Sequence, residues 1–446
     1  MGLTGLEIFK QLPKTNCGEC GVPTCLAFAM ALASGKATLS QCPYVSDAAR
    51  EALESATAPP IKLVKVGAGD NVLEIGDEQV IFRHDKTFYH PTGIFIEVAD
   101  TLSADELAAK VDEVNGLVVE RVGEQYVIDG FAIKNASGNA DAFKKAVEAV
   151  ASKTNKVLAL LSEDAAAMEA AAGAVSDRKP LLYAATADNY EKMVEVAKKV
   201  GAPLAVRGND LNSLAELVDK VVALGYKELV LDSGERQTSK VLADLTQIRR
   251  LSIKKRFRTF GYPTIAFTTE EDPGMEALEA QVFVSKFASI VVMKNVSEEA
   301  LLSLLTWRRN IYTDPQKPIA VQPGVYAIGD ATPDSPVYIT TNFSLTYYTV
   351  ATEVESTRLP SYLIAFDTDG LSVLTAWAGG KFVGETIGEW LKTSELNEKV
   401  NQKKIIIPGG VAAIKGKIEE LSGWEVIVGP RDASGISSFA KLRLGA

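Results

Sequence analysis

The chain has 446 residues, a formal net charge of −10, and 47% hydrophobic and 23% charged residues. A chain of this length is too long for one ordinary hydrophobic core, so we expect two or three domains. The acidic net charge disfavours binding to nucleic acid or to an acidic membrane surface. Four cysteines are too few for a secreted disulfide framework, no apolar run reaches the roughly 18 residues of a membrane helix, and the N-terminus lacks the layout of a secretory signal, so we expect a cytoplasmic protein.

The first predicted domain is a small helical module, residues 1–57, that contains all four cysteines. Apolar spacing and alanine content predict helices within residues 5–12, 24–35 and 46–56. Pro59 and Pro60 follow this module. Because proline removes a backbone donor and restricts the residue before it, we expect a linker there.

The cysteines are arranged as Cys17-x2-Cys20-x4-Cys25-x16-Cys42, and Pro43 follows the last of them. Three interpretations compete: four unrelated buried cysteines, a structural zinc site, and an iron–sulfur cluster. Unrelated cysteines would be spread along the whole chain, and zinc sites commonly pair two Cys-x2-Cys knuckles, of which only one is present. Closely spaced cysteines with a more distant Cys-Pro are typical of clusters. We therefore predict that these four thiolates bind a [4Fe–4S] cluster.

Residues 58–92 are predicted to form a linker and a hairpin around Gly76-Asp77. From residue 93 to residue 312, strand-like apolar runs alternate with amphipathic helical stretches. Eight such β units favour a central TIM-like (β/α)8 barrel, residues 93–312, over a doubly wound sheet, which is the alternative. The predicted strands are residues 93–99, 126–133, 156–162, 180–186, 203–209, 228–233, 264–269 and 289–294.

The predicted barrel offers few reactive groups where its strands end. The polar residues there include no histidine–carboxylate metal set and no serine–histidine pair, so we expect the barrel to act as a scaffold and docking surface. The alternative is that Asn209 and Asp232 bind a pterin or another small ligand. The stretch RRLSIKKRFR, residues 249–258, has six basic residues and is interpreted as a solvated helix face or a partner-docking face. The strand-end residues are Asp100, Asp164, Asn209, Asp210, Asp232 and Glu235.

Prolines and a glycine in residues 312–324 predict a second linker. Beyond it, residues 325–446 predict a smaller Rossmann-like open α/β sheet, with strands at 336–342, 361–369, 403–409 and 424–430. Loops of small residues follow these strands, and ligands of open α/β sheets bind beyond the carboxyl ends of strands. This favours a large, flat ligand lying close to the backbone, with N–H donors from helix starts at Gly370, Gly409 and Ala433.

Two absences narrow the choice of ligand in this third domain. No G-x-G-x-x-G motif is present, which disfavours a dinucleotide. The two histidines of the chain, His84 and His90, lie outside this domain. A metal cofactor bound there would therefore have no local imidazole as its axial ligand.

The whole chain resembles the large (gamma) subunit of the corrinoid iron–sulfur protein of the reductive acetyl-CoA pathway. The resemblance rests on KTNCGECGVPTCLAFAMALASGKA (14–37), with three of the cysteines, on CPYVSDAAREAL (42–53), with the fourth, and on three segments of the third domain. These are SPVYITTNFSLTYY (335–348), PSYLIAFDTDGLSVLTAWA (360–378) and GWEVIVGPRDASGI (423–436).

The resemblance implies two cofactors, a [4Fe–4S] cluster and a base-off cobamide (a B12-type corrinoid) without a protein histidine ligand. It implies that cob(I)amide accepts a methyl group from methyltetrahydrofolate through a separate methyltransferase. The methyl group then passes to acetyl-CoA synthase/CO dehydrogenase, and the cluster reduces cob(II)amide back to cob(I)amide. Further implied partners are a small (delta) subunit, as a heterodimer, and a reductive activator, with no nucleic acid and no membrane.

Two other functions stay open at this point. In one, the barrel itself binds the methyl-pterin and the chain is a self-contained methyltransferase. In the other, the chain is a plain electron-transfer protein with an unrelated ligand in its third domain.

The resemblance also implies individual ligand residues. Cys17, Cys20, Cys25 and Cys42 would bind the cluster. Thr375, about one helical turn after Gly370, would lie beneath the cobalt face. The residues implied to contact the corrinoid are Thr340, Thr346, Gly370, Leu371, Ser372, Val373, Leu374, Thr375, Gly409, Gly410, Gly429, Pro430, Arg431, Ala433, Ser434 and Gly435.

Overall fold

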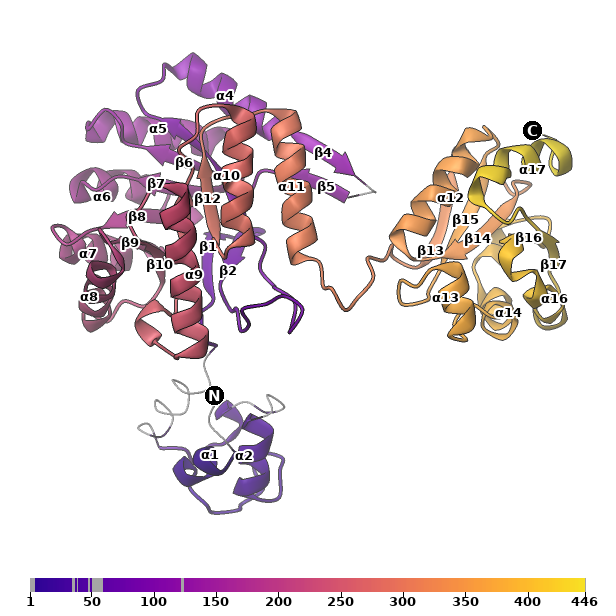
Figure 1. Cartoon of the computed structure of the whole chain (residues 1–446), viewed down its shortest axis with the longest axis horizontal. Helices are drawn as coiled ribbons and strands as arrows, with labels where there is room; N and C mark the ends of the chain where they lie inside the picture. The colour runs from indigo at the N-terminus through magenta and orange to yellow at the C-terminus, as the bar shows by residue number, and fades with distance from the viewer. Residues whose placement is uncertain are drawn as a thin grey trace. The chain divides into compact units, whose positions relative to one another are not determined.

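The computed structural model describes residues 5–33, 37, 39–46, 49, 59–121 and 124–445 (Figure 1). The predicted helix at 46–56 lies almost entirely outside these residues. Internal contacts divide the chain into two units, residues 1–119 with 127–312, and residues 120–126 with 313–446. Each unit is described by itself below.

The cysteine module contains two short helices, α1 (Gly5–Gln11) and α2 (Cys25–Ala33), and the turn η1 (Leu39–Gln41). Ile8, Phe28 and Ala29 are buried between them, and Cys25 and Cys42 belong to the same small core. The two helices approach so closely that a Cβ added at Gly5 would overlap the side chain of Met30. A larger residue at position 5 would therefore push the helices apart.

The first hairpin of the chain is formed by β1 (Val64–Ala68) and β2 (Asn71–Ile75), which pair antiparallel. The prediction of a hairpin around Gly76-Asp77 was therefore wrong, because the turn lies at Gly69-Asp70. This earlier turn lets β1 place Val64 and Val66 in the barrel core beside Ile75. Residues 76–92 then run to the barrel without a strand.

Eight parallel strands form the barrel, and they match the eight predicted apolar runs. Their sheet order is β10-β9-β8-β7-β6-β3-β12-β11. A further parallel bridge between Leu231 and Thr264 joins the two ends of the order, so the sheet is nearly closed and the doubly wound alternative was wrong. The strands are β3 (Gly93–Ala99), β6 (Gly130–Lys134), β7 (Val157–Leu161), β8 (Leu181–Ala185), β9 (Leu204–Arg207), β10 (Leu229–Asp232), β11 (Ile265–Phe267) and β12 (Ile290–Met293).

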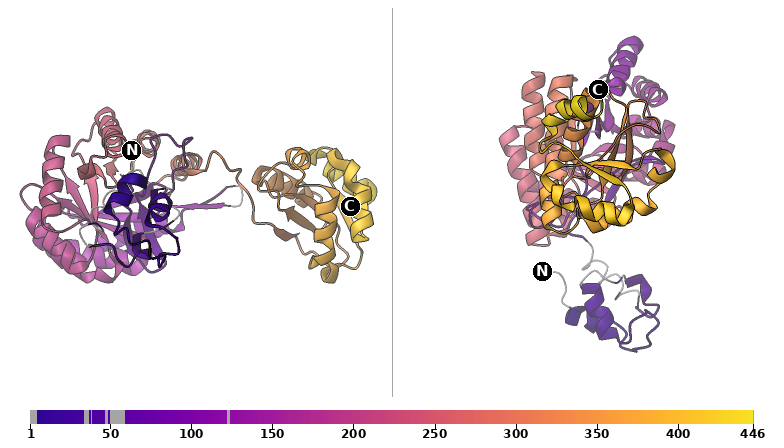
Figure 2. Two further views of the ribbon diagram at one scale, coloured as in Figure 1. Left: turned by 90° about the horizontal axis from the view of Figure 1, so that it is seen from below. Right: turned by 90° about the vertical axis from the view of Figure 1, so that its right-hand side faces the viewer.

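Helices surround the barrel (Figure 2). Several begin where polar side chains cap free N–H groups. Asp164 accepts from the first turn of α6, and Asp210 from the first turn of α8. The elements are α4 (Ala104–Gly116), α5 (Ala140–Lys153), α6 (Ala165–Ala174), η2 (Ser176–Arg178), α7 (Tyr190–Val200), α8 (Leu211–Ala223), α9 (Thr238–Lys254), η3 (Arg258–Phe260), α10 (Pro273–Ser285) and α11 (Glu298–Tyr312), with a small hairpin of β4 (Val118–Arg121) and β5 (Glu124–Val127).

A buried ion pair fixes residues 76–92 to the barrel. The Arg249 guanidinium lies 2.9 Å from the Glu78 carboxylate, and the two side chains are only 5% and 9% exposed. Arg249 also donates to the carbonyl of Val80 and lies between the rings of Phe88 and Phe287. The interpretation of residues 249–258 as a solvated face was therefore wrong for Arg249.

Replacing Glu78 by glutamine is expected to lower the free energy of unfolding by about 3 kcal/mol, because it leaves the buried Arg249 charge without its carboxylate. Glu228→Gln is the matched control, since Glu228 pairs with Lys62 at the surface and exposed pairs contribute about 0–1 kcal/mol. Urea denaturation of the complete chain measures both. Equal losses in the two variants would contradict the account.

The C-terminal unit contains an open five-stranded sheet in the order β13-β15-β14-β16-β17. Four strands are parallel and the edge strand β13, which was not predicted, is antiparallel. Both faces of the sheet carry a hydrophobic cluster. The strands are β13 (Gly324–Ile328), β14 (Val337–Thr341), β15 (Ser361–Phe366), β16 (Lys404–Ile407) and β17 (Glu425–Val428), and the helical elements are α12 (Ser344–Ser356), α13 (Val373–Ala378), α14 (Gly384–Thr393), α15 (Leu396–Lys399), η4 (Gly409–Ile414), α16 (Lys415–Ser422), η5 (Ala433–Gly435) and α17 (Ile436–Arg443).

None of the helices in the described ranges combines the length and the apolar character that crossing a bilayer requires.

Candidate functional site

A pocket of about 300 Å³ opens at the carboxyl end of the C-terminal sheet. Its walls come from the segments that follow four neighbouring strands: Thr346 after β14, Leu374 after β15, Gly410 after β16 and Arg431 after β17. In open α/β sheets this edge is where ligands bind. The full lining is Tyr338, Ile339, Thr340, Thr346, Val350, Val373, Leu374, Ile406, Ile407, Pro408, Gly410, Pro430, Arg431, Asp432, Ala433 and Ile436.

Two glycines let the loops after β16 and β17 meet backbone to backbone. A Cβ added at Gly409 would lie 2.6 Å from the carbonyl oxygen of Gly429. One added at Gly429 would lie 3.0 Å from the Ile406 side chain and from the Ile407 carbonyl oxygen. These glycines shape the pocket wall without lining it, whereas Gly410 faces the pocket and has only Leu374 nearby, at 3.5 Å.

Two buried hydroxyl groups of the pocket have no hydrogen-bond partner in the described part of the chain. They belong to Tyr338 and Thr340, which are 3% and 1% exposed. Burial raises the pKa of Tyr338 to about 12, so this hydroxyl keeps its proton. A buried polar group without a partner is costly, and a polar ligand in the pocket would satisfy both groups. The site therefore fits a ligand that brings hydrogen-bonding atoms below the loops.

The structure brings half of the residues predicted for the corrinoid into this pocket. They are Thr340, Thr346, Val373, Leu374, Gly410, Pro430, Arg431 and Ala433. The other predicted residues lie in the same loops but do not line the pocket, and their contact with a ligand stays a prediction. They are Gly370, Leu371, Ser372, Thr375, Gly409, Gly429, Ser434 and Gly435.

The loop after β15 explains part of this division. Gly370 has a left-handed φ of +73°, and a Cβ there would meet Pro318 and Ala320 rather than the pocket. The side-chain oxygen Oδ1 of Asn342 accepts from the N–H groups of Thr368 and Gly370, which fixes the turn. Thr375 lies within hydrogen-bonding distance of Ser372, at 3.0 Å between the hydroxyl oxygens.

The lining residues that we did not predict are mostly apolar and lie inside strands or on helices. Ile406 and Ile407 on β16 form part of the floor, and Val350 on α12 and Ile436 on α17 form part of one side. Their sequence pattern is that of any buried strand or helix, so no local signal marks them. Tyr338 differs, because a buried tyrosine needs a partner for its hydroxyl.

Replacing Thr340 by valine is expected to weaken corrinoid binding about tenfold, the loss of one hydrogen bond to a ligand. Stability without ligand is expected to stay unchanged or to rise, because the removed hydroxyl has no partner. Thr341→Val is the matched control: Thr341 is equally buried and unpartnered but does not line the pocket. Equilibrium titration with cobamide measures both variants, and equal weakening would contradict this role of Thr340.

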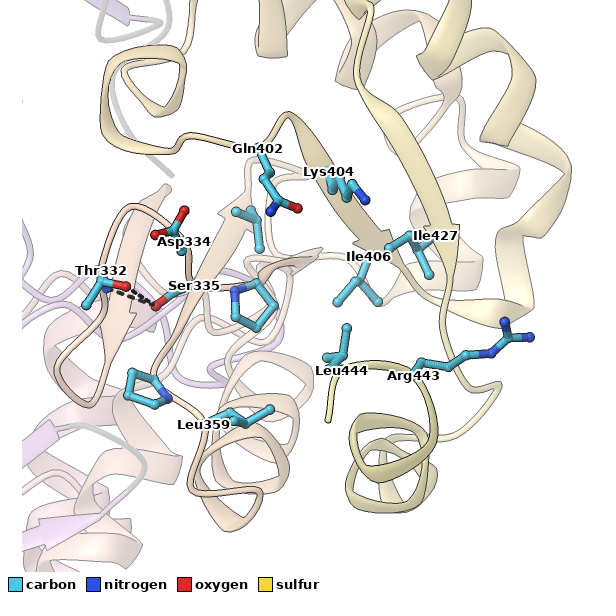
Figure 3. A pocket seen from close by; sticks show the side chains of 13 residues that line it. Thr332, Asp334, Ser335, Leu359, Gln402, Lys404, Ile406, Ile427, Arg443 and Leu444 are labelled. Carbon is cyan, nitrogen blue, oxygen red and sulfur yellow. Dashed lines mark hydrogen bonds between the residues drawn. The ribbon is translucent and has the colours of Figure 1, made fainter. Parts of the chain in front are cut away.

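A second, larger cavity of about 470 Å³ lies at the amino ends of the same strands (Figure 3). Lys404 at its rim is 3.2 Å from the Glu425 carboxylate, and Arg443 extends away from the other lining side chains. None of the predicted site residues lines this cavity, and it lacks the glycine loops. Size alone therefore does not identify the site in this domain.

The four cysteines of the N-terminal module differ in how exposed they are. Cys25 and Cys42 are buried, Cys20 is half-buried and Cys17 is exposed. Asn16 positions the loop: its side-chain oxygen accepts from the Cys25 N–H at 2.8 Å, and its own N–H donates to the Cys25 sulfur at 3.4 Å. Gly18 and Gly21, both with positive φ, turn the chain between the cysteines.

Tyr44 lies beside two of the thiols. The pKa of its hydroxyl is raised, first by a hydrogen bond to Glu19, then by the Glu19 charge, and to a smaller extent by burial and by Cys17 and Cys42. Cys17 and Cys42, the first and last cysteines of the motif, both act on Tyr44.

Within the described residues, no three Cys, His, Asp or Glu side chains surround a single point closely enough to hold one metal ion. Zinc needs four ligands around one ion, whereas the ligands of a [4Fe–4S] cluster bind four separate iron atoms and stand farther apart. Cys20, Cys25 and Cys42 lie in or against one small core, Cys17 lies outside it, and four thiols fit the cluster in donor chemistry. The ligand set itself stays a prediction.

The strand ends of the barrel surround a polar cavity of about 470 Å³, which Tyr183 and Arg236 line. The predicted ligand residue Asp232 does not belong to this lining and is buried behind these two side chains, which it binds. Asp232 accepts from Arg236 at 3.1 and 2.9 Å, from the Tyr183 hydroxyl at 2.7 Å and from the Gly234 N–H. The Arg236 guanidinium also lies over the Phe267 ring. A pterin would have to displace this arginine to reach Asp232, and Asp164 and Asp210 are helix caps.

The open sheet with a glycine-shaped pocket, the parallel barrel and the cysteine module together define a multidomain protein built to hold cofactors. The chain belongs to the family of CO dehydrogenase/acetyl-CoA synthase subunits, because the family model described as CO dehydrogenase/acetyl-CoA synthase delta subunit matches residues 63–440. A second model, described as a putative Fe-S cluster, matches residues 12–44, the region of the four cysteines.

Relatives match the chain over its whole length. It is 59% identical over 446 residues to the corrinoid/iron-sulfur protein large subunit of Moorella thermoacetica, which covers 100% of both chains. It is 38% identical to the acetyl-CoA decarbonylase/synthase complex subunit gamma of Methanopyrus kandleri, covering 98% of this chain and 97% of that one. The predicted resemblance to the large (gamma) subunit is confirmed.

Among solved structures, a dihydropteroate synthase of Yersinia pestis aligns with 49% of this chain and 94% of its own, with 16% identity and a TM-score of 0.37. A similarity at this level carries no argument about function.

Proposed function

We propose that this chain is a methyl-group carrier that holds a base-off cobamide in a Rossmann-like C-terminal domain and a [4Fe–4S] cluster on its N-terminal module. When bound, the corrinoid supplies a cobalt nucleophile that takes a methyl group from methyltetrahydrofolate and passes it to acetyl-CoA synthase, while the cluster supplies single electrons that keep the cobalt reduced. The names of the relatives and the Fe-S family match support both cofactors.

The observation that carries the proposal is the pocket at the carboxyl end of the C-terminal sheet. One wall forms where Gly409 and Gly429 let two loops come into contact. The residues that line the pocket include Tyr338 and Thr340, whose buried hydroxyl groups have no hydrogen-bond partner among the described residues. Backbone loops without bulky side chains suit a broad, flat macrocycle above the pocket, and the narrow pocket beneath suits a smaller appended group. No histidine lies in this domain, which fits a cofactor without an imidazole ligand.

The residues of this chain would bind and shield the cofactor rather than perform proton transfer. Thr340 and Tyr338 would donate hydrogen bonds to it, and Leu374, Ile406 and Ile407 would exclude water from one end. The predicted domains, 1–57, 93–312 and 325–446, would let a tethered cluster module visit the corrinoid domain when the cobalt needs an electron.

The relatives' names describe subunits of a complex, which supports partners for this chain. We propose the predicted set: a small (delta) subunit forming a heterodimer, a methyltetrahydrofolate:corrinoid methyltransferase, acetyl-CoA synthase/CO dehydrogenase and a reductive activator. The predicted cytoplasmic location stays a prediction. A self-contained methyltransferase is not favoured, because Arg236 and Tyr183 already occupy the barrel carboxylate of Asp232.

A single-turnover experiment tests the carrier function. Anaerobically reduced, cobamide-loaded protein is mixed with methyltetrahydrofolate labelled in its methyl group, with and without an added methyltransferase. We expect label on the protein only when the methyltransferase is present. Labelling without it would favour the barrel as the methyl-transfer site, and no labelling in either mixture would contradict the carrier function.

A further inference from the structure

A second concave site lies on the outside of the barrel, far along the chain from the cysteines and the glycine loops. It has a volume of about 400 Å³ and is lined by residues of α9, α10 and α11 together with the segment 81–88. These three helices lie side by side (Figure 1). The lining residues are Ile81, Phe82, Arg83, His84, Phe88, Thr246, Arg250, Lys254, Ser285, Lys286, Phe287 and Ile311.

The charged side chains that line this cavity are all basic, although the Asp85 carboxylate lies 3.6 Å from the lining residue His84. Arg250, Lys254 and Lys286 are exposed and have no ion-pair partner among the described residues, and no aspartate or glutamate belongs to the described lining. This is unusual for a chain whose net charge is −10. Cations that line a concave, low-dielectric wall concentrate their field and attract anions.

The basic side chains come together from separate segments rather than from one charged stretch. Arg250 and Lys254 are four residues apart on α9, so they lie on one face and repel each other. Lys286 follows the last residue of α10. A cation at the C-terminal end of a helix interacts favourably with the helix dipole, which accounts for the positions of Lys254 and Lys286. It does not account for Arg250, nor for the fact that all three side chains line the same cavity.

The floor of the cavity is aromatic and firmly held. The rings of Phe88 and Phe287 enclose Arg249, at 5.2 and 5.0 Å from its guanidinium carbon. The charge of Arg249 is neutralised by Glu78, so it does not contribute to the field above the floor. Arg83 donates to the Asn310 carbonyl, which fixes the segment 81–88 against α11.

An aromatic surface also stands at the rim. Phe82 is 54% exposed, and its ring stacks on His84 with centroids 5.5 Å apart. The site therefore combines three cations that lack partners with an exposed aromatic ring. Cations of this kind bind phosphate groups, and an exposed ring favours a planar apolar body.

We propose that this cavity binds a small phosphate-bearing ligand with an aromatic body, of the nucleoside diphosphate class. Arg250, Lys254 and Lys286 bind the phosphates, and the aromatic body packs against Phe82. The basic stretch at residues 249–258 thus divides into a buried structural part, Arg249, and a ligand-binding part.

Isothermal titration of the complete chain with ADP, and separately with inorganic pyrophosphate, tests this proposal. We expect ADP to bind at least fivefold more tightly than pyrophosphate. We also expect the affinity for ADP to fall as salt is added. Lys254→Glu is expected to weaken ADP binding at least tenfold. Lys255→Glu is the matched control: it changes the same charge on the next residue, which is exposed and does not line the cavity.

Three results would overturn the proposal. Absence of ADP binding at millimolar concentration would remove the site. Equal losses in Lys254→Glu and Lys255→Glu would mean that only general charge matters. Equal affinities for ADP and pyrophosphate would contradict the claim that an aromatic group of the ligand packs against Phe82. The absorption of the loaded cofactors serves as a folding control and is expected to be the same in both variants.

Discussion

Replacing Cys20 by alanine is expected to abolish or convert the [4Fe–4S] cluster, with loss of its iron and of its broad visible absorption. The position suits this test, because Cys20 is only half-buried and its sulfur makes one weak contact, 3.8 Å from the Val22 carbonyl oxygen. Cys25 and Cys42 are part of the module's core, so their replacement would mix the loss of a ligand with a packing defect.

The same variant separates electron supply from methyl transfer. If the cluster only supplies electrons, chemically reduced Cys20→Ala protein still accepts a methyl group at the rate of the unaltered protein, but it no longer recovers after oxidation. Tyr44→Phe is the control, because it removes the hydrogen bond to Glu19 at the same loop without removing a thiol. A full cluster in Cys20→Ala, or failure of the chemically reduced variant to accept methyl, would contradict the account.

Replacing Gly410 by leucine is expected to reduce corrinoid binding more than a hundredfold. A Cβ at Gly410 meets only Leu374, at 3.5 Å, so the backbone accepts a side chain. Both residues line the pocket, and the added side chain would fill it. The loss of binding would thus come from occupied space, with the fold retained.

Gly416→Leu provides the comparison for that variant. Gly416 lies in α16 of the same unit, and nothing lies within 4 Å of a Cβ added there. Cobamide titration with circular dichroism as a folding check measures both variants. Unchanged binding in Gly410→Leu, or equal loss in Gly416→Leu, would show that the pocket is not the corrinoid site.

The barrel was predictable because its parallel strands are buried on both faces and therefore appear as short, continuous apolar runs. β7 and β8, each fully buried along its length, are examples. The first hairpin was not predictable from local sequence. Gly69-Asp70 and Gly76-Asp77 are the same dipeptide, and the choice between them depends on Val64 and Val66 packing into the barrel core.

The candidate site also has a part that was predictable from the sequence and a part that was not. Its loops carry a signal, since small residues and glycines recur after successive strands, and Gly410, Pro430 and Arg431 line the pocket. Its floor carries no such signal, because Ile406 and Ile407 belong to the hydrophobic core of the domain and would be apolar whether or not a pocket lay beside them. Long-range partners were also hidden: the pairing of Arg249 with Glu78 joins residues 171 positions apart.

The central claim is that one chain holds both a corrinoid and an iron–sulfur cluster. An anaerobic visible spectrum of the purified protein, reconstituted with iron, sulfide and cobamide, tests it most directly. We predict corrinoid bands superimposed on the broad absorption of a [4Fe–4S] cluster, with the bands of the base-off form. A spectrum without corrinoid bands after reconstitution would contradict the account.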